Sequence, residues 1–397
     1  MAITINSQPD LIAPAYNNMV FSLESSNVGN ANFKFICDIY NDAYPTVFIR
    51  KKLPANPSNG YCYFDIAGIV RNYMTSDPPT DVLVQFIDCT KSYANYTVKF
   101  GEEYGATSGI VEYPDLETVS QITFIAAIDY VDFTQQLITV DDFNMGLSVP
   151  SRFLTNIPDN IEVRLQDYFW LSFINNDSDV VDVLIRQYNS AGGLLQSDHT
   201  ADNLGLTATL QQVGCGAANI VNSIGMDAAT SYYTVVLSDS GHGVSEVRTF
   251  NLIEYCSPIS ETYTLTFLNK LGGYDSMNFF GQPLKTSTST KSTFKKRQGS
   301  WKGANYNYAP TDRNKVQYQT MIQDSVKLMT GWITDEQATW LEELFSSPDV
   351  LVTYGDYSLI PVNITDSNFT WKTTSREKLF SLEFMMDFST MRIRQQY

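Results

Sequence analysis

One stretch of the sequence, residues 263–280, constrains the fold more than any other. Residues 263–267 (YTLTF) alternate large apolar side chains with threonine, which is the two-residue period of a half-buried strand. Gly272 and Gly273 supply backbone that accepts positive φ at a reversal, and the aromatic-rich residues 274–280 can return as a second strand. The stretch therefore predicts a β-hairpin, and none of its residues is chemically reactive.

Strand-like segments recur about every 10 to 15 residues along most of the chain, separated by turns that carry Asn, Asp, Gly or Pro. The chain holds 24 Tyr and 23 Phe and is 43% apolar, as many short strands around packed cores require. We predict a mainly β fold: two tandem β-sandwich domains of immunoglobulin or fibronectin type, then a β-sandwich or barrel module with one packed α-helix and a long basic loop.

The predicted domain boundaries lie where the strand-like sequence pattern is interrupted. Residues 1–120 form an N-terminal β-sandwich, residues 121–258 a connector plus a second β-sandwich, and residues 259–397 a C-terminal β-module. Within the connector, residues 121–130 are apolar enough for either a strand or a helix, and periodicity alone leaves both open.

The clearest helix signal covers residues 335–346 in the C-terminal module. Thr334 precedes it as N-cap with Gln337 three residues on, the capping-box arrangement. An apolar stripe that begins at Trp340 predicts one buried face, and Pro348 ends the helix.

Residues 285–315 form a basic arm with eight cations and one acid, Asp312. The chain has 26 Lys and Arg against 43 Asp and Glu in all, so 18 basic residues face 42 acidic ones elsewhere. Such a Ser/Thr-rich segment builds no core of its own and is predicted as a loop or arm between strands. Contact with the acidic surface of another protein, a solvated loop and nucleic-acid contact all stay open for it. The candidate interface residues are Lys285, Lys291, Lys295, Lys296, Arg297, Lys302, Arg313 and Lys315.

Cysteine and histidine usage predicts no cofactor and no metal site. The cysteines are odd in number and lack paired spacing, so we expect buried free thiols without disulfides. Both histidines are expected in loops, and zinc would need a cluster of such ligands. The residues concerned are Cys37, Cys62, Cys89, Cys215, Cys256, His199 and His242.

No motif predicts catalysis. Neither a Gly-x-Ser-x-Gly elbow nor a Walker or Rossmann glycine pattern occurs, and Gly214-Cys215-Gly216 is interpreted as a tight turn. Adjacent acids point apart on a strand or helix, so these pairs are predicted to be solvated surface: Asp141-Asp142, Glu102-Glu103 and Glu342-Glu343.

The tryptophans leave a binding alternative open. Exposed aromatic rings beside Asp or Asn would form a sugar-stacking platform, whereas strand aromatics more often belong to cores or subunit interfaces. The residues in question are Trp170, Trp301, Trp332, Trp340 and Trp371.

Several short sequence segments occur in an order that resembles one group of proteins. They are residues 153–158 (FLTNIP), 168–173 (YFWLSF), Ser245-Glu246 with Phe250, 255–258 (YCSP), 267–275 (FLNKLGGYD) and 344–350 (LFSSPDV), preceded by 5–9 (INSQP), 14–16 (PAY) and 32–33 (NF). The chain is thereby similar to virion structural proteins of tailed phages of Bacteroidetes, including crAss-like phages. These segments are structural, so the resemblance carries over no functional residue.

The resemblance implies a non-enzymatic component of a tail, tail tip or ring that works as an adaptor in oligomeric assembly. Its expected partners are other copies of itself, as a ring-forming homo-oligomer, and neighbouring virion proteins. A net charge of −17 disfavours nucleic acid and anionic membranes. Because the first residues lack a signal peptide pattern, we expect assembly in the host bacterial cytoplasm. A glycan-binding or host-adhesion protein is the alternative, and a polysaccharide hydrolase is a third reading.

Overall fold

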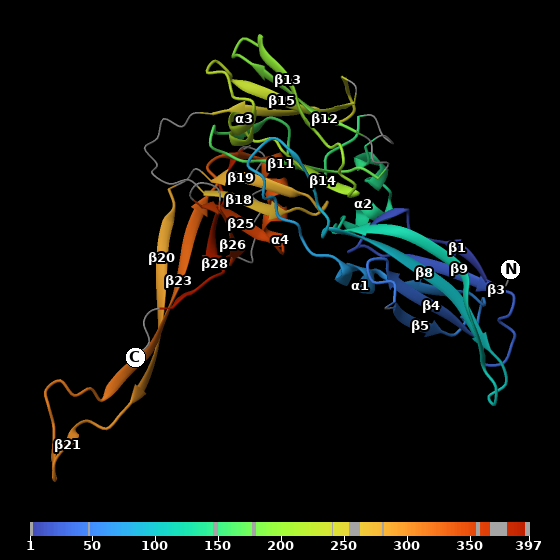
Figure 1. Ribbon diagram of the computed structural model, residues 1–397, viewed down its shortest axis with the longest axis horizontal. Helices are drawn as coiled ribbons and strands as arrows, with labels where there is room; N and C mark the ends of the chain where they lie inside the picture. The colour runs from blue at the N-terminus through green and yellow to red at the C-terminus, as the bar shows by residue number, and fades with distance from the viewer. Residues whose placement is uncertain are drawn as a thin grey trace. The chain divides into compact units, whose positions relative to one another are not determined.

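A computed structural model describes residues 3–46, 48–145, 150–176, 180–239, 241–253, 263–279, 282–354, 358–365 and 379–393. The chain divides into two compact units. Figure 1 labels their helices and strands and colours them by residue number. The first comprises residues 1–255 and Leu268–Ser276, and the second comprises Cys256–Phe267 and residues 277–397. The predicted mainly β, sandwich-rich fold is confirmed. The three-domain division by residue number stays a prediction.

The first part of unit 1 is a sandwich of two sheets. Phe21, Leu23 and Phe64 point inward from one sheet and meet Phe35 and Phe100 from the other, so the alternating pattern of these strands buries one face of each sheet. The smaller sheet has the order β1 (Ile3–Ser7), β3 (Val20–Ser25), β6 (Cys62–Asp65), and the larger has the order β2 (Ile12–Pro14), β9 (Val111–Phe124), β8 (Tyr93–Tyr104), β4 (Lys34–Asn41), β5 (Phe48–Leu53).

The structure largely resolves the choice between strand and helix for residues 121–130. Residues 121–124 complete β9, which pairs with β8 from Tyr93↔Phe124 to Tyr104↔Val111. The helix α2 (Tyr130–Thr134) starts at the far end of this stretch. Thus residues 121–124, predicted as connector, extend the first sandwich instead.

The rest of unit 1 holds two further sheets and the other short helices. One sheet has the order β10 (Ile161–Val163), β17 (Arg248–Leu252), β15 (Tyr232–Asp239), β12 (Asp182–Tyr188), β13 (Leu194–Asp202), with β16 (His242–Gly243) paired to β15. The other has the order β11 (Trp170–Ile174), β14 (Leu210–Gly214), β7 (Phe86–Asp88). The remaining helical segments of this unit are α1 (Ala67–Val70), η1 (Arg71–Tyr73), η2 (Val140–Phe143) and α3 (Ala217–Ser223).

Unit 2 is built on one eight-stranded sheet. Its order is β19 (Tyr274–Phe279), β18 (Tyr263–Leu268), β25 (Val350–Tyr354), β26 (Ser358–Ile364), β28 (Glu383–Phe388), β23 (Lys315–Met329), β20 (Leu284–Lys295), with β29 (Arg392–Ile393) paired to β23. Two small ribbons accompany it, β21 (Ser300–Lys302) with β22 (Asn305–Asn307) and β24 (Ile333–Thr334) with β27 (Leu379–Phe380).

The predicted hairpin is present as β18 and β19. Gly272 has φ +89°, and its amide donates to the Asn269 carbonyl at 3.2 Å. The expectation of a half-buried strand is wrong, because all six residues of β18 are buried. The threonine face is accommodated by polar pairing: the Thr264 hydroxyl donates to Asn278 Oδ1 at 2.5 Å.

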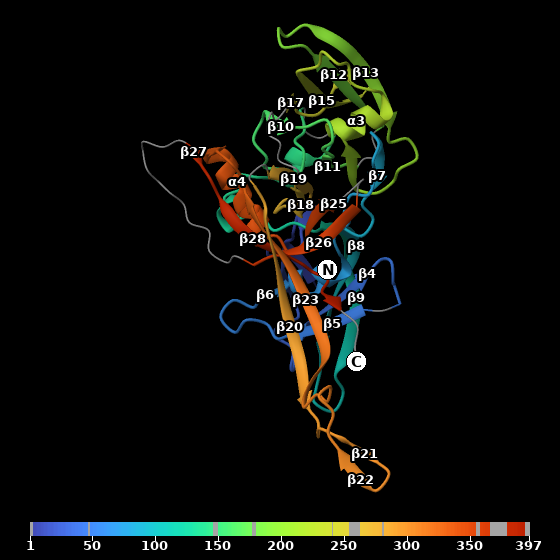
Figure 2. The same ribbon diagram turned by 90° about the vertical axis from the view of Figure 1, so that its left-hand side faces the viewer.

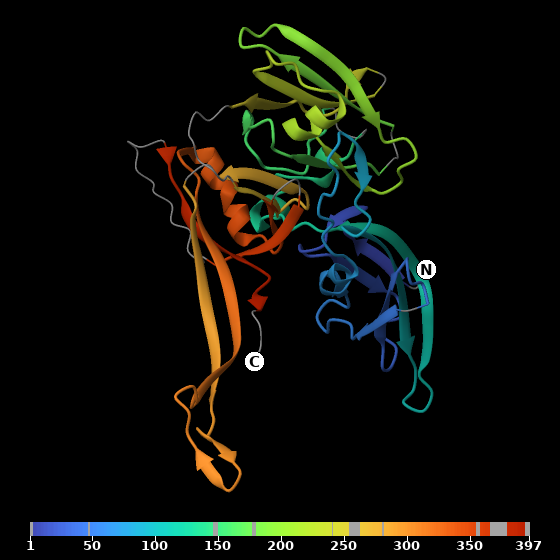
Figure 3. The ribbon, with the colours of Figure 1, turned by 60° about the vertical axis from the view of Figure 1, so that its left-hand side comes forward.

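The predicted helix is confirmed as α4 (Asp335–Ser346), with its capping box formed as the sequence indicates. The Gln337 amide donates to Thr334 Oγ1 at 3.3 Å, and the Thr334 amide donates to Gln337 Oε1 at 3.0 Å. Trp340 packs on Phe267 of β18 with ring centroids 5.5 Å apart. The helix therefore covers one face of the unit 2 sheet, as Figure 3 shows.

Candidate functional site

The predicted basic arm forms strands rather than a loop. β20 pairs with β23 from Leu284↔Lys327 at the sheet to Lys295↔Lys315 at the far end. β28 pairs with β23 only over Ser325–Met329, and β29 only at Met321 and Ile322. Beyond these contacts the two strands continue as a projecting two-stranded ribbon, seen in Figures 1 and 2. We call residues 284–329 the basic ribbon.

The sequence predicts a loop over β20 because the pattern of this strand has no apolar face. β20 reads LKTSTSTKSTFK and is almost entirely exposed. Thr and Ser alternate without hydrophobic residues, so the period that marks a half-buried strand is missing. Threonine nevertheless has high β-propensity, and the strand is held by backbone pairing with β23.

The ribbon ends in a small hairpin formed by β21 and β22. Lys302 lies opposite Asn305, which leaves Gly303 and Ala304 as a two-residue turn with Gly303 at φ +64°. Gly299 precedes β21 at φ +88°, and a Cβ atom there would lie 2.5 Å from the Tyr306 ring. Glycine at this position thus lets the Tyr306 ring lie against the backbone.

Three aromatic side chains gather at this tip. The Trp301 and Tyr306 ring centroids lie 5.3 Å apart and those of Tyr306 and Tyr308 lie 5.4 Å apart. The Arg297 guanidinium lies over the Tyr306 ring at 5.3 Å. Trp301 is 72% exposed and Tyr308 is 73% exposed. Trp, Tyr and Arg are the residue types that dominate binding energy in protein interfaces, so the tip has the composition of a contact surface.

All eight predicted interface cations lie exposed on the ribbon. With Lys285 set aside, none of them forms an ion pair with a described residue, and the single acid of the segment, Asp312, accepts the Ala309 amide at 2.7 Å within a turn. Cations near the base differ, because Lys327 pairs with Glu383 and Arg392 pairs with Asp324. The outer ribbon therefore presents its positive charge to solvent or to a partner.

A serine, histidine and aspartate meet elsewhere, in unit 1. His199 Nδ1 lies 2.8 Å from Asp182 Oδ2, and the Ser238 hydroxyl donates to Asp182. His199 is on β13, and His242 is on β16, so the expectation of loop histidines is wrong. A catalytic triad needs the nucleophile at Nε2 and the acid at Nδ1, whereas both neighbours here lie at Nδ1. The cluster is a cross-strand network.

The adjacent acids Glu102 and Glu103 are buried, which corrects the prediction of solvated surface. Glu102 is 1% exposed and accepts hydrogen bonds from the Ser25 hydroxyl at 2.7 Å and from Asn27 Nδ2 at 2.6 Å. Glu103 pairs with Lys34 at 3.1 Å and Lys52 at 2.6 Å, and Lys52 holds the pKa of Glu103 below its usual value. Each carboxylate therefore has a structural partner.

A third buried group lies beside Gly214-Cys215-Gly216, which connects the end of β14 to the N-cap of α3. Burial raises the pKa of Asp81 to about 7, while the N–H groups of Trp170 and Gly214 lower it by less. Cys215 is 0% exposed, and burial raises its pKa well above the usual range. A thiol without solvent access or thiolate character is not a nucleophile. The four described cysteines are buried free thiols, as predicted, and Cys256 lies outside the described residues.

The tryptophans divide between core and surface. Trp170 and Trp340 are buried, whereas Trp301 and Trp332 are exposed and Trp371 lies outside the described residues. Within the described ranges, no group of three or more His, Cys, Asp or Glu could hold a metal ion. In the same ranges, no helix has the length and apolar character needed to cross a membrane.

Comparisons with known proteins add no family. No family model matches the sequence, and no curated protein matches it. Among solved structures, the chain is similar to the native conformation of E. coli alpha-2-macroglobulin at 7% identity and a TM-score of 0.17. That alignment covers 96% of this chain and 27% of the other.

Proposed function

We propose that the protein is a non-enzymatic structural component of a tailed phage virion, in the tail, the tail tip or the ring that joins the tail to its appendages. It acts by protein–protein assembly, with the basic ribbon as its contact. The virion assignment rests on the sequence resemblance. The assembly role rests on one observation, the projecting ribbon whose exposed cations surround an aromatic tip on an otherwise acidic chain.

The basic ribbon lacks the hydrophobic support that a two-stranded hairpin usually needs. A two-stranded hairpin is marginally stable in water unless a hydrophobic face supports it, and almost all of β20 is exposed. Burial against a partner would supply the missing face. Other copies of this chain fit as partners, because 42 acidic residues lie outside the basic segment and complementary charge speeds and orients association.

Sedimentation velocity of the purified full chain tests this proposal at low and high salt. We expect self-association at low salt that weakens as salt rises, because exposed charge pairs are screened over about 8 Å at physiological ionic strength. A variant with Lys295→Gln, Lys296→Gln and Arg297→Gln should stay monomeric. Wild-type protein that is monomeric at every concentration and salt would contradict self-assembly.

A matched control separates local contact from total charge. Gln8→Glu, Thr107→Glu and Gln135→Glu make the same change in net charge at exposed positions outside the ribbon. This variant should self-associate like the wild type. Trp301→Ala should weaken association in the same way as the ribbon charges, without changing net charge. Equal effects of the control and ribbon variants would mean that only the total charge matters.

A further inference from the structure

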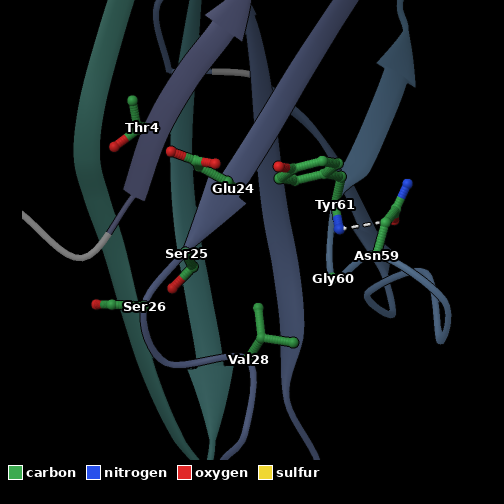
Figure 4. Close-up of a pocket in the computed structure, with 8 residues that line it drawn as sticks. All are labelled: Thr4, Glu24, Ser25, Ser26, Val28, Asn59, Gly60 and Tyr61. Carbon is green, nitrogen blue, oxygen red and sulfur yellow. Dashed lines mark hydrogen bonds between the residues drawn. The ribbon is translucent and has the colours of Figure 1, made fainter.

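A pocket on unit 1 lies on the outer face of the β1–β3–β6 sheet, with a cavity volume of about 400 Å³. Figure 4 shows its lining, in which the Tyr61 ring points toward Glu24 across the hollow and the Glu24 carboxylate extends toward the side of Thr4. Thr4 lies directly opposite Glu24 in the pairing of β1 with β3. The volume falls in the range of about 300–1,000 Å³ that small-molecule sites occupy.

The loop that carries Tyr61 is held in place by its own hydrogen bonds. The Asn56 amide donates to the Tyr61 carbonyl at 2.8 Å, and the Gly60 amide donates to the Asn56 carbonyl at 2.8 Å. The Tyr61 amide donates to Asn59 Oδ1 at 3.1 Å, while Gly60 has φ +78°. The backbone that carries Tyr61 is thus fixed before any ligand arrives, which lowers the entropy lost on binding.

Most polar groups of the pocket are left for a ligand. The Glu24 carboxylate forms no hydrogen bond or ion pair with a described residue, and the same holds for the hydroxyls of Thr4, Ser26 and Tyr61. Asn59 uses its Oδ1 within the loop, and its Nδ2 points away from the hollow in Figure 4. Ser25 is the exception, because its hydroxyl donates to Glu102 and accepts the Asn27 amide.

We propose that this pocket binds a neutral pyranose, such as the terminal sugar of a glycan. The carboxylate of Glu24 accepts hydrogen bonds from two neighbouring sugar hydroxyls, a charge-assisted geometry that neutral acceptors do not match. The Tyr61 ring and the Val28 methyl groups offer an apolar surface for the C–H face of the sugar.

Other ligand classes fit these groups less well. An anionic ligand would be repelled by the Glu24 carboxylate, since no cation lines the pocket. A hard metal ion such as Ca²⁺ takes six to eight oxygen ligands, usually with several carboxylates, and the pocket lining supplies one carboxylate. An apolar ligand would leave Glu24 desolvated and unpaired.

Saturation-transfer NMR on the full chain tests the proposal with methyl glycosides of glucose, galactose, mannose and N-acetylglucosamine. We expect transfer to the protons on one face of at least one sugar, with a Kd in the millimolar range. Glu24→Gln should weaken binding about tenfold or more, because a hydrogen bond to a charged group contributes about 1.5–3 kcal/mol. Tyr61→Ala should also weaken binding, because it removes the aromatic surface for the C–H face of the sugar. Both side chains are at least partly exposed, so circular dichroism should show unchanged folding.

Tyr63→Ala is the matched control, because Tyr63 is 68% exposed on the same sheet and does not line the pocket. It should bind like the wild type. The proposal fails if no glycoside shows transfer, if the Tyr61 and Glu24 variants bind normally, or if EDTA abolishes the signal. None of these variants touches the basic ribbon, so the result is independent of the proposed assembly role.

Discussion

Lys295 lies directly opposite Lys315 at the outer end of the pairing between β20 and β23. Both side chains are exposed, and like charges at directly opposed positions destabilise an antiparallel pair. The two lysines therefore repel each other, and replacing either one would remove this repulsion. An acidic partner would turn this repulsion into a shared attraction, which agrees with the proposed assembly contact.

Lys315→Glu should stabilise the ribbon while weakening assembly. An opposite-charge pair with Lys295 contributes roughly 0.2–1 kcal/mol, so hydrogen exchange of the ribbon amides should slow. Self-association should fall in the same sample, measured by sedimentation. Lys291→Glu serves as the control for stability, because Lys291 lies opposite Thr320. Tighter self-association of Lys315→Glu would overturn the electrostatic account.

Trp340→Ala should destabilise unit 2 by about 3–5 kcal/mol, the usual cost of truncating a buried aromatic residue. Trp340 is 5% exposed and packs on Phe267, so its loss leaves a cavity between α4 and the sheet. Denaturant unfolding measures the change. Trp332→Ala is the control at 76% exposure and should change stability by less than about 0.5 kcal/mol. Equal effects of the two changes would mean that α4 does not anchor the unit.

Gly272→Ala should destabilise the protein more than Gly205→Ala. Both glycines have positive φ, +89° and +88°, where an alanine is strained by about 1–2 kcal/mol. A Cβ atom at Gly272 would lie 2.3 Å from the Ile125 carbonyl oxygen, whereas nothing lies within 4 Å at Gly205. The difference between the two melting temperatures isolates this close contact. Equal temperatures would indicate that the hairpin turn is free to shift.

The free energy of unfolding should fall as pH rises from about 4 to about 7, because the Asp81 carboxyl is buried. Burial raises the pKa of its carboxyl from 3.8 to about 7 in the folded protein, so in this range the folded state binds more protons than the unfolded chain. Asp81→Asn should remove this slope and be more stable than the wild type above pH 7. Denaturant midpoints across this pH range provide the measurement. An unchanged slope in Asp81→Asn would show that another group titrates.

The four described cysteines should not react with a thiol reagent in the native protein. Burial raises the pKa of Cys62 to about 11 and those of Cys37 and Cys89 further, so little thiolate exists at neutral pH. Cys256→Ser removes the fifth thiol from the assay. This variant should release no colour with Ellman's reagent when native and four equivalents in unreduced denaturant. Fewer equivalents would reveal a disulfide.

Local signals were enough to locate α4 and the hairpin. The Thr334 and Gln337 capping box and the turn at Gly272 depend on residues a few positions apart, so their chemistry is readable in the sequence. The mainly β fold followed from the same kind of pattern. The charge of the basic ribbon is evident in the sequence, whereas the strand β20 is not, because β20 carries no hydrophobic period.

The sequence by itself thus determined the strand-rich fold, the capped helix and the placement of eight cations in one segment. The tertiary structure alone decided that β7 pairs with β14 although more than a hundred residues separate them, that Glu102 and Glu103 are buried, and that the Tyr61 ring points toward Glu24. Each of these depends on partners that are distant in the chain. Pairing and burial are fixed by which surfaces meet in three dimensions, and a local pattern specifies only which face of a segment is apolar.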